Sequence, residues 1–189
     1  MANINGPGDS ELYNRFRHGD TKAYDQLMIR YGNDLTLFLY GYLHDWQDAE
    51  DLMIESFARI MAKRPRIGED KFKAYLFRTG RNLASRFHAR KTRISQFSFD
   101  EYEIDIAGKE LVEEKLVGDE RREAVRKCLD RIDPQLREAL WLVYVEGMSY
   151  AEAAKIMKVT SKRIDHLLQR GKKQMRIELE KEGVAGAYR

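Results

Sequence analysis

Apolar side chains recur every three or four residues through most of the chain, which is the period of an amphipathic α-helix. Alternating runs of β-branched residues, typical of strands, are absent from the sequence, and it contains only three prolines. The pattern therefore predicts an all-α protein. In the amino-terminal half it predicts a short helix from a Ser10 cap, a long one from a Thr21 cap to Leu43, a third from Asp45 to Pro65 and a fourth from Asp70 to Arg90.

The carboxyl-terminal half carries a second set of helical signals. A helix is expected over about residues 121–131, followed by Asp133 as a cap and Pro134 at the first position of another helix. Gly147 is expected to end that helix. Its predicted apolar face consists of Leu136, Ala139, Leu140 and Val143.

The stretch between the two halves has a different composition. Residues 97–120 contain nine acidic and two basic residues, and no apolar stripe is sustained before Leu111. Such a composition is typical of a linker. We therefore expect two small helical domains joined by a flexible acidic linker. The predicted boundaries are 1–9 for a flexible arm, 10–96 for the first domain, 97–120 for the linker, 121–180 for the second domain and 181–189 for a tail.

Residues 149–173 form a helix-turn-helix pattern. Ser149 and Glu152 have the spacing of a capping box, and residues 158–161 make a tight connection into a second helix. Ile164, Leu167 and Leu168 are expected to face inward. The polar residues of this second helix, which suit base edges and phosphates in a major groove, are Ser161, Lys162, Arg163, Asp165, His166, Gln169, Arg170 and Lys172. An ordinary helical hairpin with a solvated polar face is the alternative interpretation.

Residues 63–93 are strongly basic, with eleven Lys and Arg against two acids, and include Tyr75 and Phe87. Cations neutralise phosphates and exposed aromatic rings stack on unpaired bases, so the mixture favours single-stranded or melting DNA. Phe72, Leu76 and Leu83 lie on one helical stripe, and about half of the aromatic side chains are equally compatible with a plain core.

An acidic pattern lies on the third predicted helix. Asp48, Asp51 and Glu55 fall near one helical face, beside apolar Met53 and Ile54, which makes a docking surface for a basic partner. The spacing also allows a solvated face or a metal site. The metal site is disfavoured because the helix has no His at ligand spacing.

Composition narrows the class of protein. The net charge is only +3 although 34% of residues are charged, so the distribution of charge matters more than its sum. The single cysteine, Cys128, excludes an internal disulfide, suits a reducing cytoplasm and is expected to be buried. The sequence has no apolar run near the roughly 18 residues that span a bilayer and no signal pattern at its start, so we expect a cytoplasmic protein without membrane insertion.

Enzyme signatures are absent from the sequence. It contains no nucleophile and base pattern, no phosphate-cradling glycine loop and no metal cluster among its four histidines, which are His18, His44, His88 and His166. We therefore expect a non-enzymatic protein without a cofactor or a metal.

Three segments, taken in order, resemble the extracytoplasmic-function (ECF) sigma factors of the sigma-70 family. DAEDLMIESFARI (48–60) resembles the conserved helix of their region two, and FKAYLFRTGRNLASRFHARK (72–91) resembles their promoter-melting helix. IDPQLREALWLVYVEGMSYAEAAKIMKVTSKRIDHLLQRGKKQM (132–175) resembles region four. The resemblance implies a subunit that binds the clamp and flap of core RNA polymerase and promoter DNA. It also implies an anti-sigma factor as a partner, and a linker that runs towards the RNA exit channel.

The resemblance also implies roles for single residues. Core polymerase binding falls to Asp48, Asp51, Leu52, Glu55 and Phe57. Contacts with the minus-10 element fall to Arg64, Lys71, Tyr75, Arg78, Arg81, Asn82, Arg86 and Arg90, with the loop 64–71 near a flipped base. The helix from Ser161, with the polar residues given above, would read the minus-35 element.

Two departures from the family pattern stand out. Tyr75 occupies the place of the usual tryptophan in the melting helix and keeps an aromatic face. In the reading helix the usual Thr-Val-Lys-Ser-Arg run is replaced by residues 163–167, where Asp165 and Leu167 stand in place of two cations. Asp165 can accept a hydrogen bond from a cytosine amino group. Because these substitutions change the reading helix, the family pattern does not determine which promoter sequence this chain reads.

Two other functions remain compatible with the sequence. A sigma-like decoy that sequesters a regulator would explain the altered reading helix, although the cations Arg78, Arg81 and Arg86 argue against it. A dimeric helix-turn-helix repressor would need a dimerisation or ligand domain, and the amino-terminal half instead resembles a polymerase-binding module.

Overall fold

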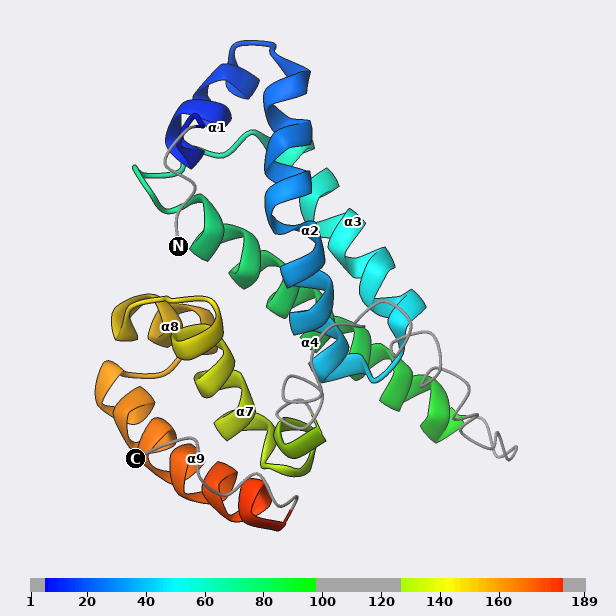
Figure 1. The fold of residues 1–189 in the computed structure, drawn as a ribbon. Coiled ribbons are helices and arrows are strands. Elements are labelled where there is room, and N and C mark those ends of the chain that lie inside the picture. Colours follow the sequence, from blue (N-terminus) through cyan, green and yellow to red (C-terminus); the bar gives the residue numbers. More distant parts are fainter. Residues whose placement is uncertain (1–5, 98–126, 182–189) are drawn as a thin grey trace. The chain divides into compact units, whose positions relative to one another are not determined.

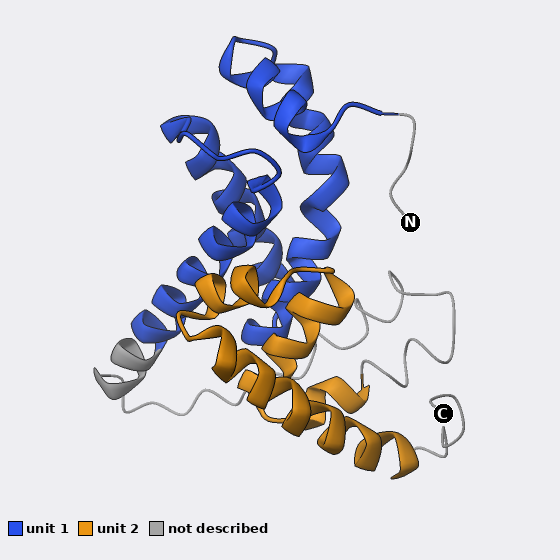
Figure 2. Ribbon diagram, turned by 90° about the vertical axis from the view of Figure 1, so that its left-hand side faces the viewer, with its two compact units in different colours: residues 1–103 blue, residues 104–189 orange. Residues whose placement is uncertain are grey.

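The computed structural model describes residues 6–97 and 127–181, with side chains described up to Lys91 in the first range. All regular structure in these ranges is helical, and they contain no strand. The chain divides into two compact units, residues 1–103 and 104–189 (Figure 2). The expected all-α class is therefore confirmed, and each unit is described by itself.

Four helices build the first unit (Figure 1). They are α1 (Asp9–Arg17), α2 (Thr21–Leu43), α3 (Trp46–Lys63) and α4 (Phe72–Phe97). Helices α2, α3 and α4 all pack against one another, and α1 packs on α2 and α4. The core between them contains Leu12, Phe16, Leu27, Leu35, Leu39, Phe57, Ile60, Phe72, Leu76 and Phe77, each at most 2% exposed.

The helix starts differ in detail from the sequence prediction. Helix α1 begins after Gly8, not at Ser10, whose hydroxyl contacts Asp70 instead. Helix α2 is capped by Asp20, one residue before the expected Thr21, because the Asp20 carboxylate accepts from the Ala23 amide at 3.2 Å. The expected start at Asp45 is confirmed, since its carboxylate accepts from the Asp48 amide at 2.8 Å.

The boundaries of the first domain also change. Within the predicted arm 1–9, the Pro7 carbonyl and Asp9 both accept from Arg30 of α2, while residues 1–5 lie outside the described part of the chain. Helix α4 continues to Phe97, beyond the expected end at Arg90. The predicted linker from residue 98 onward, the start of the helix 121–131 and the tail from residue 182 lie outside the described residues.

The second unit contains a helical turn at 127–131, then α7 (Pro134–Leu140), the π-helical turn η1 (Trp141–Val145), α8 (Tyr150–Met157) and α9 (Ser161–Lys181). The Asp133 cap is confirmed, and Cys128 is fully buried as expected. Gly147, with φ of +66°, follows the end of η1. The prediction for Val143 is wrong: it is half-buried, and Leu142 is fully buried in its place, because the π turn shifts the register.

Candidate nucleic-acid interface and docking surface

Three carboxylates project from α3. Asp51 is exposed, whereas Asp48 and Glu55 are half-buried. Glu55 Oε1 pairs with Arg59 Nη2 at 2.6 Å, and Asp48 Oδ2 lies 4.0 Å from Lys91 Nζ. Partial burial, reinforced by the neighbouring carboxylate of Asp45, raises the pKa of Asp48. An accessible acidic face of this kind suits contact with a basic partner.

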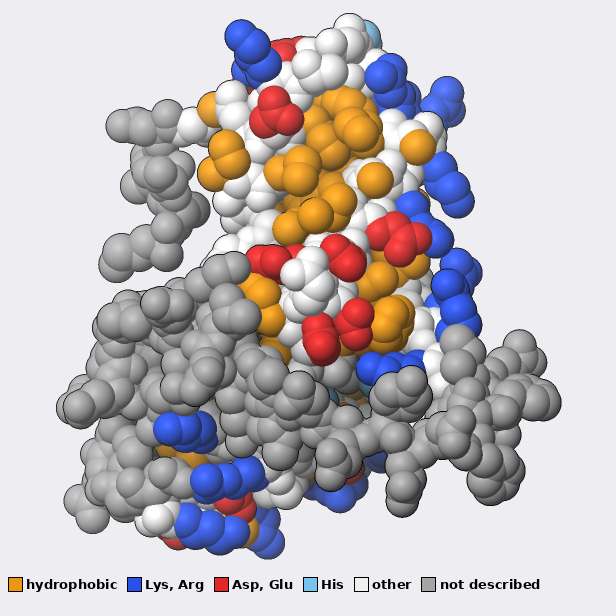
Figure 3. Space-filling model, turned by 90° about the vertical axis from the view of Figure 1, so that its right-hand side faces the viewer, with side chains coloured by type: hydrophobic (Ala, Val, Ile, Leu, Met, Phe, Trp, Pro, Cys, Tyr) orange, Lys and Arg blue, Asp and Glu red, His pale blue; other side chains and the backbone are white. Residues whose placement is uncertain are grey.

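Apolar side chains accompany this acidic face. Ile54 and Met61 of α3 are 53% and 46% exposed. Figure 3 shows a side of the first unit on which acidic side chains gather next to apolar ones. A surface that mixes the two combines charge steering with apolar burial.

Two residues expected at the polymerase contact lie in the core instead. Leu52 is 6% exposed and Phe57 is 1% exposed, and the Tyr24 hydroxyl donates to the Phe57 carbonyl at 2.6 Å. In this conformation neither side chain is available to a partner. Their packing fixes α3 on α2 and so orients the acidic face.

Side chains of α3 and α4 surround a surface hollow of about 160 Å³. Three of the predicted DNA-contacting residues, Tyr75, Asn82 and Arg86, line it from α4. Arg59 and Lys63 line it from α3. The hollow therefore combines an aromatic ring, an amide and three cations, which is the chemistry that binds a base and its phosphates.

The other predicted residues of this surface lie around the hollow. Arg78 is exposed with its guanidinium carbon 5.2 Å from the centroid of the Tyr75 ring, and Arg90 is exposed further along α4. Arg81 is half-buried on the same helix. Arg64 and Lys71 are exposed at the two ends of the loop 64–71, which connects α3 to α4.

In the second unit, α8 and α9 form the predicted helix-turn-helix. The capping box is confirmed, since Ser149 Oγ accepts from the Glu152 amide at 3.3 Å and Glu152 Oε2 accepts from the Ser149 amide at 3.0 Å. Lys158, with φ of +58°, ends α8. Ile164, Leu167 and Leu168 are buried as expected.

The outer face of α9 carries the predicted reading residues. Lys162, Arg163, His166, Gln169 and Arg170 are exposed, as is Ser161, and Asp165 is half-buried with its carboxylate accepting from Gln169 Nε2 at 3.0 Å. Lys172 lies towards η1, with its ammonium 4.8 Å from the centroid of the Tyr144 ring. A hydrogen bond to Tyr144 raises the pKa of Lys172. Lys172 is thus drawn towards Tyr144, while the other residues remain on the open face.

Two segments of the chain match family models. Residues 27–94 match Sigma-70 region 2, and residues 122–175 match Sigma-70, region 4. Together the two matches span more than half of the 189-residue chain, one within each unit. The chain belongs to the sigma-70 family. It is a sigma factor, and sigma factors direct transcription initiation.

Curated relatives of this sigma factor include several of the ECF type. The chain is 27% identical over 158 residues to the RNA polymerase sigma-H factor of Pseudomonas aeruginosa, with 79% of this chain and 82% of that protein covered. It is 26% identical to the ECF RNA polymerase sigma-E factor of Escherichia coli, with the same coverage. The family expected from the three sequence segments is therefore confirmed.

Solved structures share the fold of this sigma factor. The sigma factor RpoE of Bartonella quintana, in complex with the anti-sigma factor NepR, gives a TM-score of 0.63 at 24% identity and covers 84% of this chain and 98% of that one. CnrH, in complex with the cytosolic domain of CnrY, gives 0.63 at 21% identity and covers 91% and 97%. The two-domain helical architecture is thus that of known sigma factors.

Sequence reasoning left out one member of the basic hollow of this sigma factor, Arg59, and counted Lys63 only as part of the basic segment 63–93. Arg59 belongs to α3, which was otherwise considered for its acidic face. The spacing of Arg59 and Lys63 gives a usable signal: both lie on the last two turns of α3, immediately before the loop that leads into α4. In the described ranges no helix is long and apolar enough to span a membrane. The same ranges hold no group of three potential metal-binding side chains.

Proposed function

We propose that this sigma factor brings core RNA polymerase to a specific set of promoters, as a non-catalytic subunit that acts in the cytoplasm. The observation that carries the proposal is the basic hollow, where Tyr75 and Asn82 of α4 meet Arg59, Lys63 and Arg86. Cations hold phosphates regardless of sequence, while an aromatic ring and an amide suit an unpaired base. This combination supports binding of melted rather than closed promoter DNA.

The first unit docks on polymerase through α3 in this proposal. Asp51 is exposed and Asp48 and Glu55 are half-buried beside it, with apolar Ile54 on the same helix. A basic segment of the polymerase clamp would meet these carboxylates. Asp48 gains most from such a partner, because it is already partly desolvated and its charge is unfavourable without further compensation.

Recognition of the minus-10 element is assigned to the hollow, to Arg78, Arg81 and Arg90 of α4, and to the loop 64–71. Tyr75 stands where the family carries an aromatic side chain, and Arg78 above it adds a cation to the same surface. The loop presents Arg64, Arg66 and Lys71, all exposed, to a flipped base and its neighbouring phosphates.

Recognition of the minus-35 element is assigned to the outer face of α9. Lys162, Arg163 and Arg170 are exposed there and supply cations for phosphates or guanines. Asp165 is held by Gln169, so the two side chains form one unit that can accept from a cytosine amino group. We assign Lys172 a supporting role, because it lies over Tyr144.

An anti-sigma factor is proposed as a regulatory partner. Sigma factors of the same fold have been solved in complex with NepR and with the cytosolic domain of CnrY. In this chain, Ile54 and Met61 give α3 apolar surface on which such a protein could compete with polymerase. Purifying this sigma factor from its own cells and identifying the proteins that co-purify with it would identify the anti-sigma factor.

The experiment that tests the proposed function is run-off transcription with bacterial core polymerase, with and without this protein, on genomic fragments that include its own upstream region. Core binding is measured separately by gel filtration. Discrete transcripts that depend on the protein support the proposal and give both promoter elements. Core binding without any transcript from the fragments favours a decoy, and absence of core binding contradicts the proposal.

A further inference from the structure

The loop 64–71 is fastened to α1 at both of its ends. The Tyr13 hydroxyl donates to the Pro65 carbonyl at 2.8 Å, and the Asp70 amide donates to Ser10 Oγ at 2.8 Å. Arg64 adds a third contact, with its guanidinium carbon 5.1 Å from the centroid of the Phe16 ring. The hydrogen-bonded partners are 52 and 60 residues apart in the chain, so tertiary packing alone brings them together.

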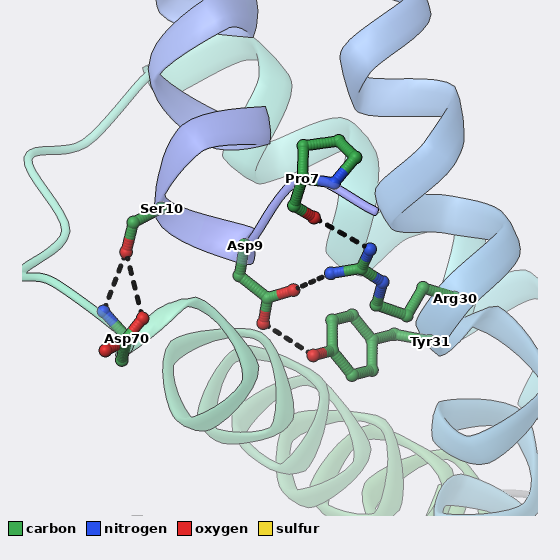
Figure 4. Close-up of polar contacts among 6 residues, drawn as sticks. All are labelled: Pro7, Asp9, Ser10, Arg30, Tyr31 and Asp70. Carbon is green, nitrogen blue, oxygen red and sulfur yellow. Dashed lines mark hydrogen bonds and ion pairs between the residues drawn. The ribbon is translucent and has the colours of Figure 1, made fainter. Parts of the chain in front are cut away.

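The start of α1 is itself fixed on α2. Asp9 pairs with Arg30 and accepts from the Tyr31 hydroxyl, and Arg30 also donates to the Pro7 carbonyl at 3.0 Å. Burial, together with the bond to Asp9, raises the pKa of Tyr31, so its hydroxyl stays a donor across the neutral range. Figure 4 shows Ser10, the next residue, reaching in the direction of Asp70 from this anchored turn. Ser10 is therefore a fixed point for the loop.

Both ends of the loop have a residue in the left-handed backbone region, and at Arg64 this residue is the cap that ends α3. Arg64 has φ of +42° and Asp70 has φ of +52°, the left-handed region that residues other than glycine rarely occupy. Such conformations persist where the surrounding structure holds them in place, and they gather at functional sites. Here the contacts of Arg64 with Phe16, of Pro65 with Tyr13 and of Asp70 with Ser10 lie at the two strained ends.

The middle of the loop has little burial that could fix its shape. Arg66, Gly68 and Glu69 are exposed and only Ile67 is half-buried. One local hydrogen bond, from the Lys71 amide to the Gly68 carbonyl at 3.2 Å, closes a turn there. The path of the loop across the surface is thus set by its junctions with α3 and α4 and by the contacts of its ends with α1.

We propose that Ser10 and Tyr13 are positioning residues that set the base preference of the loop 64–71 at the minus-10 element. The proposal rests on the proposed function, in which this loop lies near a flipped base. Ser10 and Tyr13 do not touch DNA in it. They fix the loop backbone, so that the exposed side chains of Arg66 and Lys71 keep one geometry. Binding of the preferred base then does not have to order the loop, which would cost conformational entropy.

Only the two hydroxyl groups need to be removed in a test. The Tyr13 ring packs on Phe72, with ring centroids 5.3 Å apart, and Tyr13→Phe preserves this packing. Ser10 is half-buried, so Ser10→Ala leaves no large cavity. Tyr24→Phe is the matched control, because it also removes a hydroxyl that donates to a backbone carbonyl in this unit, that of Phe57 in α3 and not of the loop, while its ring keeps its packing on Phe16.

The experiment measures run-off transcription by holoenzyme from the native promoter and from promoters with single substitutions in the minus-10 element. The ratio of preferred to substituted promoter activity is compared for the wild type, for Ser10→Ala with Tyr13→Phe, for Arg66→Ala with Lys71→Ala in the loop itself, and for Tyr24→Phe. Losing three hydrogen bonds from the anchors, two at Ser10 and one at Tyr13, is expected to lower the ratio about threefold to tenfold. Ser10→Thr, which keeps the hydroxyl, should retain the wild-type ratio.

The outcomes separate this proposal from the proposed function. A lower ratio for the anchor variant and the loop variant, but not for Tyr24→Phe, supports the positioning role. If the loop variant changes the ratio and the anchor variant does not, the positioning role is wrong while the reading role of the loop stands. If neither variant changes it, the loop does not read this element, and both assignments fail. Equal loss of activity on all promoters would mark Ser10 and Tyr13 as merely structural.

A second readout does not depend on DNA. Because the Asp70 amide donates to Ser10 Oγ, its hydrogen exchange should accelerate in Ser10→Ala and stay slow in Ser10→Thr and Tyr24→Phe. Unchanged exchange in Ser10→Ala would show that the loop holds its shape without α1, and would overturn the proposal.

Discussion

At the scale of single residues, two glycines of the first unit differ in whether a side chain would fit: there is no room for one at Gly80, and there is room at Gly32. A Cβ atom at Gly80 would lie 3.0 Å from Leu35 Cδ1 and 3.3 Å from Ser56 Oγ, both of which are in fully buried side chains. At Gly32 the nearest atom would be the Met53 sulfur at 3.7 Å, which is ordinary contact. At Gly80, α4 thus approaches both α2 and α3 so closely that a side chain has no room.

We predict opposite effects for alanine at these two positions. Gly80→Ala should lower the free energy of unfolding by about 1–3 kcal/mol, because buried neighbours must shift to admit a methyl group. Gly32→Ala should raise it by about 0.5–1 kcal/mol through helix propensity. Urea denaturation of both variants checks this pair, with Gly32→Ala serving as the control. Stabilisation by Gly80→Ala would show that the helices can separate without cost.

Asp48 makes the stability of the first unit depend on pH. Its pKa is raised in the folded state, mainly by desolvation, so the fold binds this proton more tightly than the unfolded chain does. The charged carboxylate therefore destabilises the fold above the folded pKa, and this penalty disappears as the pH falls through that value. Asp48→Asn should raise Tm at pH 7, with the difference from wild type shrinking towards acid pH.

Thermal melts at several pH values measure this effect. Asp51→Asn is the matched control, since it removes the same charge from an exposed position one turn further along α3. A lower Tm for Asp48→Asn at pH 7 would contradict the prediction, and would indicate that the contact with Lys91 outweighs the burial.

At the scale of elements, the π turn η1 decides how the second unit presents its surface. It follows α7 directly and shifts the register, so that Leu142 becomes buried while Tyr144 and Val145 are 51% and 56% exposed. The Trp141 indole donates to Glu146 at 2.8 Å across the turn. Tyr144 contacts Lys172 of α9, which is exposed and has its ammonium 4.8 Å from the centroid of the Tyr144 ring.

The reading helix α9 yields a prediction that distinguishes two kinds of DNA contact. Arg163 is exposed at the start of α9, where its amide is capped by Thr160 Oγ1 at 3.2 Å. Arg163→Ala should weaken minus-35 recognition by about 1–3 kcal/mol and relax the preference at one base pair if Arg163 reads a base. Holoenzyme binding to promoters with substituted minus-35 elements measures this effect. Lys172→Ala is expected to have a smaller effect, because the Lys172 ammonium lies over the Tyr144 ring. An equal loss on every sequence would identify a phosphate contact.

At the scale of the whole molecule, each unit has its own core and its own proposed task. The cores are built from different helices, and the family matches fall one in each unit. Changes to the acidic face of α3 are therefore expected to leave the second unit folded. Polymerase association and reading of the minus-35 element can then be altered separately.

Reversing two charges on α3 tests this separation. Asp51→Lys with Glu55→Lys should strongly weaken association with core polymerase while changing the free energy of unfolding by less than about 1 kcal/mol, because the Arg59 and Glu55 side chains of the ion pair are still 40% and 44% exposed. Gel filtration with core polymerase and urea denaturation measure the two effects. Asp25→Lys with Glu180→Lys gives the same change in net charge at exposed positions elsewhere and should leave association intact. Undiminished association of the α3 variant would remove the docking assignment.

Much of this sigma factor could be predicted from its sequence, because the signals are local. The helical period, the helix start near Asp45, the Asp133 cap and the Ser149–Glu152 capping box all depend on residues within one turn of each other, and the structure confirms each of them. The three motif segments were enough to indicate the family, which the comparisons confirm. Each of these features follows from the order of residues alone.

Other features depended on contacts between distant residues. Burial of Leu52 and Phe57 follows from how α3 packs on α2, and helical spacing does not distinguish this side of α3 from an exposed one. The hollow combines Arg59 and Lys63 of α3 with Tyr75 of α4. Ser10 does not cap α1 as expected, because the helix starts before it, and its hydroxyl accepts from the Asp70 amide. The sequence by itself determined the helices, their caps and the family, because those signals span a few residues. Only the tertiary structure decided which side chains share a surface, because that depends on packing between separate helices, as in the Tyr24–Phe57 bond across 33 residues and the Asp70–Ser10 bond across 60.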